Sequence, residues 1–374
     1  MQFQTRFPQV AERFARFWRG EETDRPVLYL TAPKDRPDRS VPAPHFERPA
    51  DRITPENMLA VARHRLATTA YLAEGFPHHF TNYGPGILHG CIGGEADFSD
   101  PNTVWFPSFL KDISEFPALE FQPHGRWWQT IVATTELVLD KLGDDLLLSL
   151  TDIGGNADVV ASAVGPQQML LDCIDRPEAV RAAVWHSHRL WWQAYERHFA
   201  LLNARQDFIT PWWPVIYPGR TYMTQCDFNA MIGPRMFADL FADELGALWK
   251  GLAMGCYHLD GLGTESQVPA LLARRRNGLG CIQWVPAPGH SPLEHAAMLR
   301  SIQAAGVNIT FVVKPAEVEA MCRAFDIRRL MMHVTCPSET AARQLLADVE
   351  RCCQSAEVRA PIGVKMEQLA SAAV

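Results

Sequence analysis

The chain has 374 residues, of which 47% are hydrophobic, and a formal net charge of -7. This length suits one large α/β barrel or two ordinary domains. No apolar run approaches the roughly 18 residues of a membrane span, no apolar signal core follows the N-terminus, and a pI near 6.0 is atypical of nucleic-acid binders. Nine scattered cysteines indicate reduced thiols, so we expect a cytoplasmic protein that contacts neither membranes nor nucleic acids.

The first half of the chain alternates short strands with helices and long loops. An amphipathic pattern predicts a helix over residues 8–19, and an apolar run predicts a strand over 26–31. Thr54 before Pro55 is typical of a helix N-cap, so we expect a helix over 54–74. The remaining elements predicted here are strands over 79–83, 145–151 and 208–213, helices over 127–142 and 175–202, and loops over 84–123 and 214–227. Loops of this length usually act as lids or binding segments.

The second half repeats the alternation more regularly. It predicts strands over 256–260, 280–285, 307–313 and 330–335, with helices over 234–251, 265–276, 291–304, 315–324 and 338–354. About eight strand-helix units are typical of a (β/α)8 barrel, here with an N-terminal helix and long βα loops. We therefore expect one barrel domain over residues 1–374. A doubly wound sheet is the alternative, but the first strand is not followed by a Gly-x-Gly-x-x-Gly phosphate turn.

Polar residues at the strand ends of such a barrel would gather on one face. His258 and Asp260 are two residues apart at the end of a predicted strand, so their side chains should point the same way. The alternative is a core histidine bonded to a carbonyl and an aspartate that opens a turn before Gly261. The other candidates near strand ends are Asn82, Tyr83, Asp152, Asn156, Asp158, Trp212, Trp213, Gln283, Trp284 and Cys336.

Cys336 lies between a predicted strand and a helix whose cap would be Ser338. A helix N-terminus favours the thiolate, although most cysteines are inert and buried. With His258 and Asp260, Cys336 would supply the nitrogen, oxygen and sulfur ligands of a zinc ion with one open position. Zinc that binds a substrate thiol holds it as a thiolate, which is a strong nucleophile for methyl transfer.

Five segments give the chain a resemblance to a known family. They are DRPE at 175–178, MIGPRMF at 231–237, YHLDG at 257–261, GCIQWV at 280–285 and TCPSE at 335–339. In that order, over about Phe17 to Cys352, the chain resembles the uroporphyrinogen decarboxylase superfamily. It is most similar to a branch beside the methylcobalamin-dependent thiol (coenzyme M) methyltransferases.

The resemblance implies a zinc-dependent methyltransferase that moves a methyl group between a corrinoid or small methylated donor and a thiol-like acceptor. His258 and Cys336 match zinc ligands of those members, and Asp260 stands where they have a cysteine, which would make the metal harder. Methylcobalamin would be the methyl donor, and a corrinoid carrier protein would be a partner. The expected assembly is a homodimer. We expect Asp152, Asp158 and Asp227 to orient or deprotonate the substrate. The residues expected to line its pocket are Asn82, Tyr83, Asn156, Trp212, Trp213, Gln283 and Trp284.

Other functions fit the same residues. Asp227 could instead cap a loop, and the tryptophans could fill the barrel mouth. A metal-free alternative is general acid/base chemistry on a polyhydroxylated, sugar-like ligand, because aspartates and tryptophans would share one pocket. Decarboxylation of a porphyrinogen is a further alternative, but YLTAP at 29–33 replaces the cationic loop that holds propionates. The last alternative is a non-catalytic protein that docks a corrinoid carrier.

Overall fold

The computed structural model describes residues 2–261, 263–355 and 358. The centre of the fold is a seven-stranded sheet with the strand order β2-β1-β9-β8-β7-β6-β5. Its strands are β1 (Val27–Pro33), β2 (Thr69–Ala73), β5 (Thr221–Gln225), β6 (Met254–Asp260), β7 (Leu279–Val285), β8 (Asn308–Val312) and β9 (Leu330–Thr335). Strands β3 (His78–His79) and β4 (Leu147–Leu148) form a separate parallel pair. All neighbouring strands of the large sheet are parallel except β2, which is antiparallel to β1.

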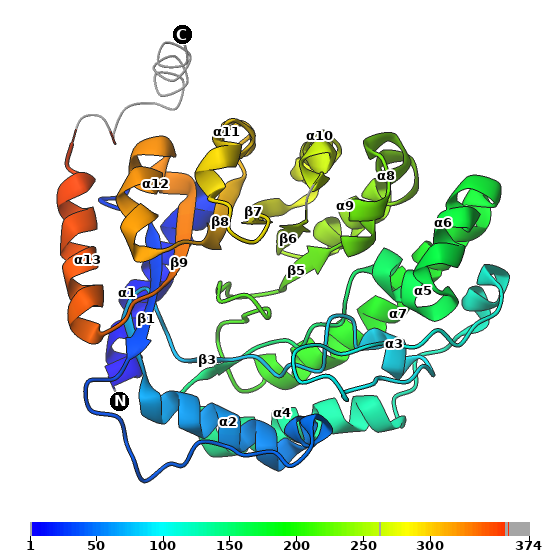
Figure 1. Cartoon of the computed structure of the whole chain (residues 1–374), viewed down its shortest axis with the longest axis horizontal. Coiled ribbons are helices and arrows are strands. Elements are labelled where there is room, and N and C mark those ends of the chain that lie inside the picture. Colours follow the sequence, from blue (N-terminus) through cyan, green and yellow to red (C-terminus); the bar gives the residue numbers. More distant parts are fainter. Residues whose placement is uncertain (1, 262, 356–357, 359–374) are drawn as a thin grey trace.

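Helices surround this sheet and make the fold mixed α/β. The α-helices are α1 (Gln2–Arg19), α2 (Pro55–Thr68), α3 (Leu88–Cys91), α4 (Arg126–Leu142), α5 (Asn156–Val164), α6 (Pro166–Asp175), α7 (Pro177–Asn203), α8 (Pro234–Leu240), α9 (Ala242–Gly251), α10 (Val268–Ala273), α11 (Ala296–Ala304), α12 (Val318–Ala324) and α13 (Glu339–Cys352). Figure 1 shows α10, α11 and α12 along the outer side of β7, β8 and β9, with α2 and α4 on the opposite side of the molecule. Within the described ranges, no helix is long and apolar enough to cross a membrane.

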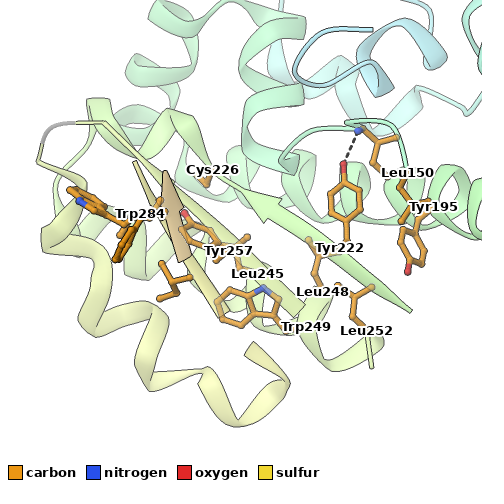
Figure 2. Close-up of a cluster of buried hydrophobic side chains, with 14 of the residues drawn as sticks. Leu150, Tyr195, Tyr222, Cys226, Leu245, Leu248, Trp249, Leu252, Tyr257 and Trp284 are labelled. Carbon is orange, nitrogen blue, oxygen red and sulfur yellow. Dashed lines mark hydrogen bonds between the residues drawn. The ribbon is translucent and has the colours of Figure 1, made fainter. Parts of the chain in front are cut away.

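The two faces of β6 pack into different apolar clusters. Tyr257 and Leu259 belong to the large cluster that the sheet forms with its helices, and Figure 2 shows Tyr257 beside Trp249 of α9. Cys256 belongs to a smaller cluster that also contains Met223 of β5. We call the face that carries Cys256 the inward face. Because side chains alternate along a strand, His258 lies on the inward face as well.

Helix α1 covers the amino-terminal edge of the sheet. Its Val10, Phe14 and Phe17 pack into the inward cluster, and its Trp18 indole N–H donates to the carbonyl of Ile216 at 2.8 Å. The helix also contacts the turn that precedes β9. This edge is therefore closed by apolar side chains, and the opposite edge, where the parallel strands end, remains for a functional site.

The strand pairing departs from the predicted barrel in several places. The strands predicted over 79–83 and 145–151 are reduced to β3 and β4, which have two residues each. The helix predicted over 54–74 ends at Thr68, and the residues after it form β2. Residues 221–225, predicted as part of a loop, form the fully buried β5. The strand predicted over 208–213 is reduced to one bridge between Ile209 and Tyr217.

Closure of a barrel is not shown by the strand pairing within the described residues. The pair of β3 and β4 is not joined to the seven-stranded sheet by a strand ladder. Beside β4, the Leu150 amide donates to the carbonyl of Thr210 at 2.9 Å, so the segment around Thr210 runs next to that strand.

Candidate functional site

Three inward-facing side chains form a polar row at the carboxyl ends of β5, β6 and β7. Gln225 is in register with His258, and His258 is in register with Gln283. The Nδ1–H of His258 donates to Oε1 of Gln283 at 2.8 Å, and its Nε2 lies 3.7 Å from Oδ2 of Asp260. The ring of Trp212 stands nearly perpendicular to the imidazole, with 5.0 Å between centroids. These contacts fix the orientation of His258 and direct Nε2 toward Asp260.

His258 and Asp260 stabilise each other's charged forms. Burial alone would lower the pKa of His258, but Asp260, Asp227 and the bond to Gln283 outweigh it and raise the pKa above the ordinary 6.5. The bond to His258 lowers the pKa of Asp260 below 3.8, against a smaller effect of burial. The side chain of His258 is 14% exposed and that of Asp260 is 47% exposed. Each group therefore favours the charged form of the other, and the pair is open to solvent on the Asp260 side.

Asp152 lies in the loop after β4 and behaves differently. Its Oδ1 accepts from the Gly154 amide at 2.9 Å and from the Tyr222 hydroxyl at 3.4 Å. Its side chain is buried, and burial, together with the nearby Asp227, raises its pKa from 3.8 to about 7 although these bonds oppose the change. Gly154 has φ of +88° and its Cα approaches Gly86 so closely that a Cβ would lie 2.5 Å from the Gly86 Cα. This loop conformation requires glycine at position 154.

Asp158 and Asp227 are linked through the backbone. Asp158, in the first turn of α5, accepts from the amides of Asp227 at 3.1 Å and of Phe228 at 2.7 Å. Burial and the neighbouring Asp227 raise the pKa of Asp158 well above 3.8, despite these two bonds. Asp227 is exposed to solvent, but the protein surrounds its carboxyl closely. The resulting desolvation raises the pKa of Asp227. The charge of Asp260 adds to this increase, and His258 opposes it. Asp158 thus positions the loop that presents Asp227.

Four predicted binding residues have partners elsewhere. The Tyr83 hydroxyl donates to Thr134 of α4 at 2.6 Å, and Asn156 is bonded to Glu244 and Ser187. Trp284 is packed in the layer between sheet and helices, where its ring contacts that of His295 with 4.9 Å between centroids. Asn82 is exposed, and its Oδ1 accepts from the Gly84 amide at 2.9 Å. Nothing in these contacts directs the four side chains toward His258.

Trp213 lies deeper on the inward side than Trp212. Its indole N–H donates to the Thr310 hydroxyl of β8 at 3.3 Å, and its ring packs on His333 of β9 with 5.4 Å between centroids. Since Thr310 is in register with Gln283, Trp213 contacts β8 next to the polar row. Trp213 therefore borders the row at β8, and Trp212 borders it at His258.

The predicted zinc ligands are only partly brought together. Cys336 follows β9, is buried, and donates its amide to the carbonyl of Thr31 at 2.7 Å. Burial raises the pKa of its thiol, which opposes the thiolate that zinc needs. Across residues 2–261, 263–355 and 358, no group of three His, Cys, Asp or Glu side chains is placed to hold a metal ion. The ligand set of His258, Asp260 and Cys336 stays a prediction.

The sequence did not single out Gln225. This residue lies in the stretch predicted as a loop, although TYMTQ at 221–225 precedes Asp227 as a strand precedes a catalytic loop. Its side chain is only 3% exposed, its Nε2 lies 3.5 Å from Oδ2 of Asp227, and its Oε1 has no hydrogen-bond partner. Gln225 belongs to the site because it is in register with His258 and its amide lies beside Asp227.

A cavity of about 1410 Å³ lies away from these residues. It borders β2, α1 and α13, and its charged lining mixes Arg6, Lys34 and Arg343 with acids such as Glu339. None of the candidate site residues lines it.

Comparison with known proteins adds no family to this description. No protein-family model and no curated protein matches the chain.

Proposed function

We propose that the chain is an enzyme that performs general acid/base chemistry on a small uncharged or basic substrate. The observation that carries the proposal is the placement of His258 in a row between Gln225 and Gln283, with Oδ2 of Asp260 3.7 Å from its Nε2, and the pKa shifts around it agree with this placement. Within one site, the pKa of Asp260 is lowered, that of His258 is raised, and that of Asp152 is raised to about 7. Neighbouring groups whose environments push their pKa values apart are typical of acid and base pairs in enzymes.

The positions of the groups indicate their roles. Asp227 and Asp260 are accessible to solvent and would contact the substrate, with Asp260 ionised as a base. His258, held by Gln283, would give and take the proton at Nε2. Asp152, whose pKa is about 7, would change the charge next to Asp227 and His258 as it gains or loses its proton. Such proton transfers typically contribute about 10² to 10⁴ in rate.

The electrostatics favour this function over porphyrinogen decarboxylation. Asp152, Asp158, Asp227 and Asp260 influence one another, and in the described chain His258 is the only cationic group among the causes of their pKa shifts. One cationic side chain cannot pair with a substrate that carries several carboxylates, whereas neutral polyols and amines need no cluster of cations.

The proposal includes a barrel as the scaffold. The inward cluster draws side chains from β1, β4, β5, β6, β7 and β9, namely Tyr29, Leu147, Met223, Cys256, Cys281 and Met331. Side chains from so many parallel strands pack together where a sheet curves around an interior. The site at the carboxyl edge is where barrel enzymes place their chemistry.

Zinc-dependent methyl transfer, which the resemblance to the uroporphyrinogen decarboxylase superfamily implies, is the second candidate. The contact between His258 and Asp260 at 3.7 Å favours it, because two of its three predicted ligands are neighbours. Bound zinc would supply a thiolate from the acceptor. Stoichiometric zinc in the purified protein, lost in both the His258→Ala and Cys336→Ser variants, would support this candidate over the first.

Conversion of small molecules tests the acid/base proposal. We expect the purified protein to convert at least one member of a panel of sugars, polyols and amines, followed by mass spectrometry. The His258→Gln variant should lower kcat/KM about 100-fold or more, because the proton carrier is lost. The exposed His290, which pairs with Glu294, offers the matched control His290→Gln, which should leave the rate unchanged. Conversion that survives in His258→Gln, or none at all by the wild type, would contradict the proposal.

A further inference from the structure

Two valines lie at the carboxyl edge of the sheet, beside the site. Val285 is the last residue of β7, and Val312 is the last residue of β8. Val285 is two residues after Gln283, which accepts from His258, so its side chain points to the inward face as that of Gln283 does. Val312 is two residues after Thr310, which is in register with Gln283, so it points to the same face.

The side chains of these two valines are uncovered. Val312 is 59% exposed although β8 is an interior strand of the sheet, and Val285 is partly exposed. Within the described chain, neither valine belongs to an apolar cluster, whereas the preceding residues, Phe311 and Trp284, are buried in the large cluster on the outward face. Uncovered apolar side chains keep apolar surface in water, and a ligand that covers this surface gains affinity.

The two valines continue a layer of side chains that starts with Asp260. Asp260 is the last residue of β6 and is in register with Val285, and neighbouring strands lie about 4.8 Å apart. Val285 and Val312 therefore form an apolar strip beside the carboxylate of Asp260, and we call these two residues the valine strip. A six-membered carbon ring covers two side chains at this spacing.

We propose that the substrate of this site carries an apolar group, which the valine strip holds while an attached hydroxyl or amino group meets His258 and Asp260. The inference rests on the proposed function, because it narrows the substrate class of the same site. A fully hydroxylated sugar would place hydroxyl groups against Val285 and Val312, whose side chains offer no hydrogen-bond partner. The valine strip thus favours alkyl- or ring-substituted alcohols and amines over sugars.

Two cyclic alcohols with the same carbon ring test this inference. Cyclohexanol carries one hydroxyl group, whereas myo-inositol carries a hydroxyl group on every ring carbon. Titration of the purified protein, followed by saturation-transfer NMR of the ligand, should give a Kd of about 10 mM for cyclohexanol. Myo-inositol should bind about 10-fold more weakly or less, because its hydroxyl groups lose water without gaining partners at the valines.

Substitution of the valines locates the binding. Val285→Thr and Val312→Thr keep the branched shape and the strand preference, and they replace a methyl group by a hydroxyl group. Each variant should raise the Kd of cyclohexanol about threefold. Ile174 is 69% exposed on α6, which lies away from β7 and β8 in Figure 1, so the control Ile174→Thr should leave the Kd unchanged. No binding of cyclohexanol, equal or tighter binding of myo-inositol, or an unchanged Kd in both valine variants would overturn the inference.

The outcomes distinguish the inference from the proposed function. Conversion of a sugar that depends on His258, together with no binding of cyclohexanol, would overturn the apolar contact alone. Cyclohexanol binding that both valine variants weaken, together with conversion that is unaffected in His258→Gln, would support the apolar contact and contradict the acid/base role.

Discussion

At pH 8, the Asp152→Asn variant should be more stable than the wild type by up to about 4 kcal/mol. The pKa of Asp152 is raised from 3.8 to about 7, so the folded protein favours the protonated carboxyl. Above pH 7 the buried group must ionise, and this costs stability that asparagine does not lose. Asparagine keeps an oxygen that can accept from the Gly154 amide and the Tyr222 hydroxyl. Urea denaturation of both proteins between pH 4 and pH 8 measures the difference.

The stability difference between Asp152→Asn and the wild type should depend on pH. A carboxyl with a raised folded pKa contributes its full stability below the unfolded value, and this contribution is lost as the pH rises toward 7. The advantage of Asp152→Asn should therefore shrink as the pH falls from 8 to 4. Asp239, which is 58% exposed, gives the control Asp239→Asn, whose stability should follow the wild type. An Asp152→Asn variant that is less stable than the wild type at pH 8 would show that the carboxylate is stabilised in the fold.

The Glu74→Gln variant should lose about 3 kcal/mol or more of stability. The carboxylate of Glu74, just after β2, accepts from Nη1 and Nη2 of the buried Arg25 at 2.6 and 2.9 Å and from the Leu28 amide at 3.0 Å, and it lies 3.0 Å from Nε of Arg13. Glutamine keeps the shape but leaves Arg25 buried beside a neutral group. Urea denaturation at pH 7 measures the loss.

An exposed glutamate provides the matched control for Glu74. Glu319 pairs with Arg323 at 3.1 Å, and both side chains are 44% exposed. Glu319→Gln should cost less than about 0.5 kcal/mol, because solvent screens an exposed pair. Adding Arg25→Met to Glu74→Gln should recover part of the stability, since it removes a buried guanidinium whose remaining partner, Glu350, is half exposed. Equal losses in Glu74→Gln and Glu319→Gln would contradict the role of this pair in joining β1 to β2.

Regular segments of the sequence predicted the fold best. The strands predicted over 256–260, 280–285, 307–313 and 330–335 correspond to β6 to β9, where apolar runs are bounded by helix caps. The cap predicted at Thr54 is confirmed, because its side chain accepts from the Asn57 amide.

The two missed strands depend on tertiary contacts. The residues of β5 are polar or aromatic in part, and only burial of all five beside β6 makes them a strand. Strand β2 continues from a helix, and its pairing with β1 is completed by Glu74, whose partners are distant in sequence. A pattern confined to the local sequence cannot contain these contacts.

The site was predictable where side-chain alternation decides the geometry. His258 and Asp260 face each other because they are two residues apart in a regular strand. The same rule separates Gln283 from Trp284, which lie on opposite faces of β7. Gln225 could not be found without β5, and the direction of Tyr83 depends on Thr134 of a helix.

The central claim is that one site holds its ionisable groups in different protonation states around His258. Carbon-13 NMR titration of the aspartate carboxyls and of the His258 ring tests it most directly, with Asp152→Asn and Asp260→Asn variants to assign the signals. We expect Asp152 to titrate near pH 7, Asp260 below pH 3.8 and His258 above pH 6.5. Titration of all three groups at their ordinary values would contradict the account.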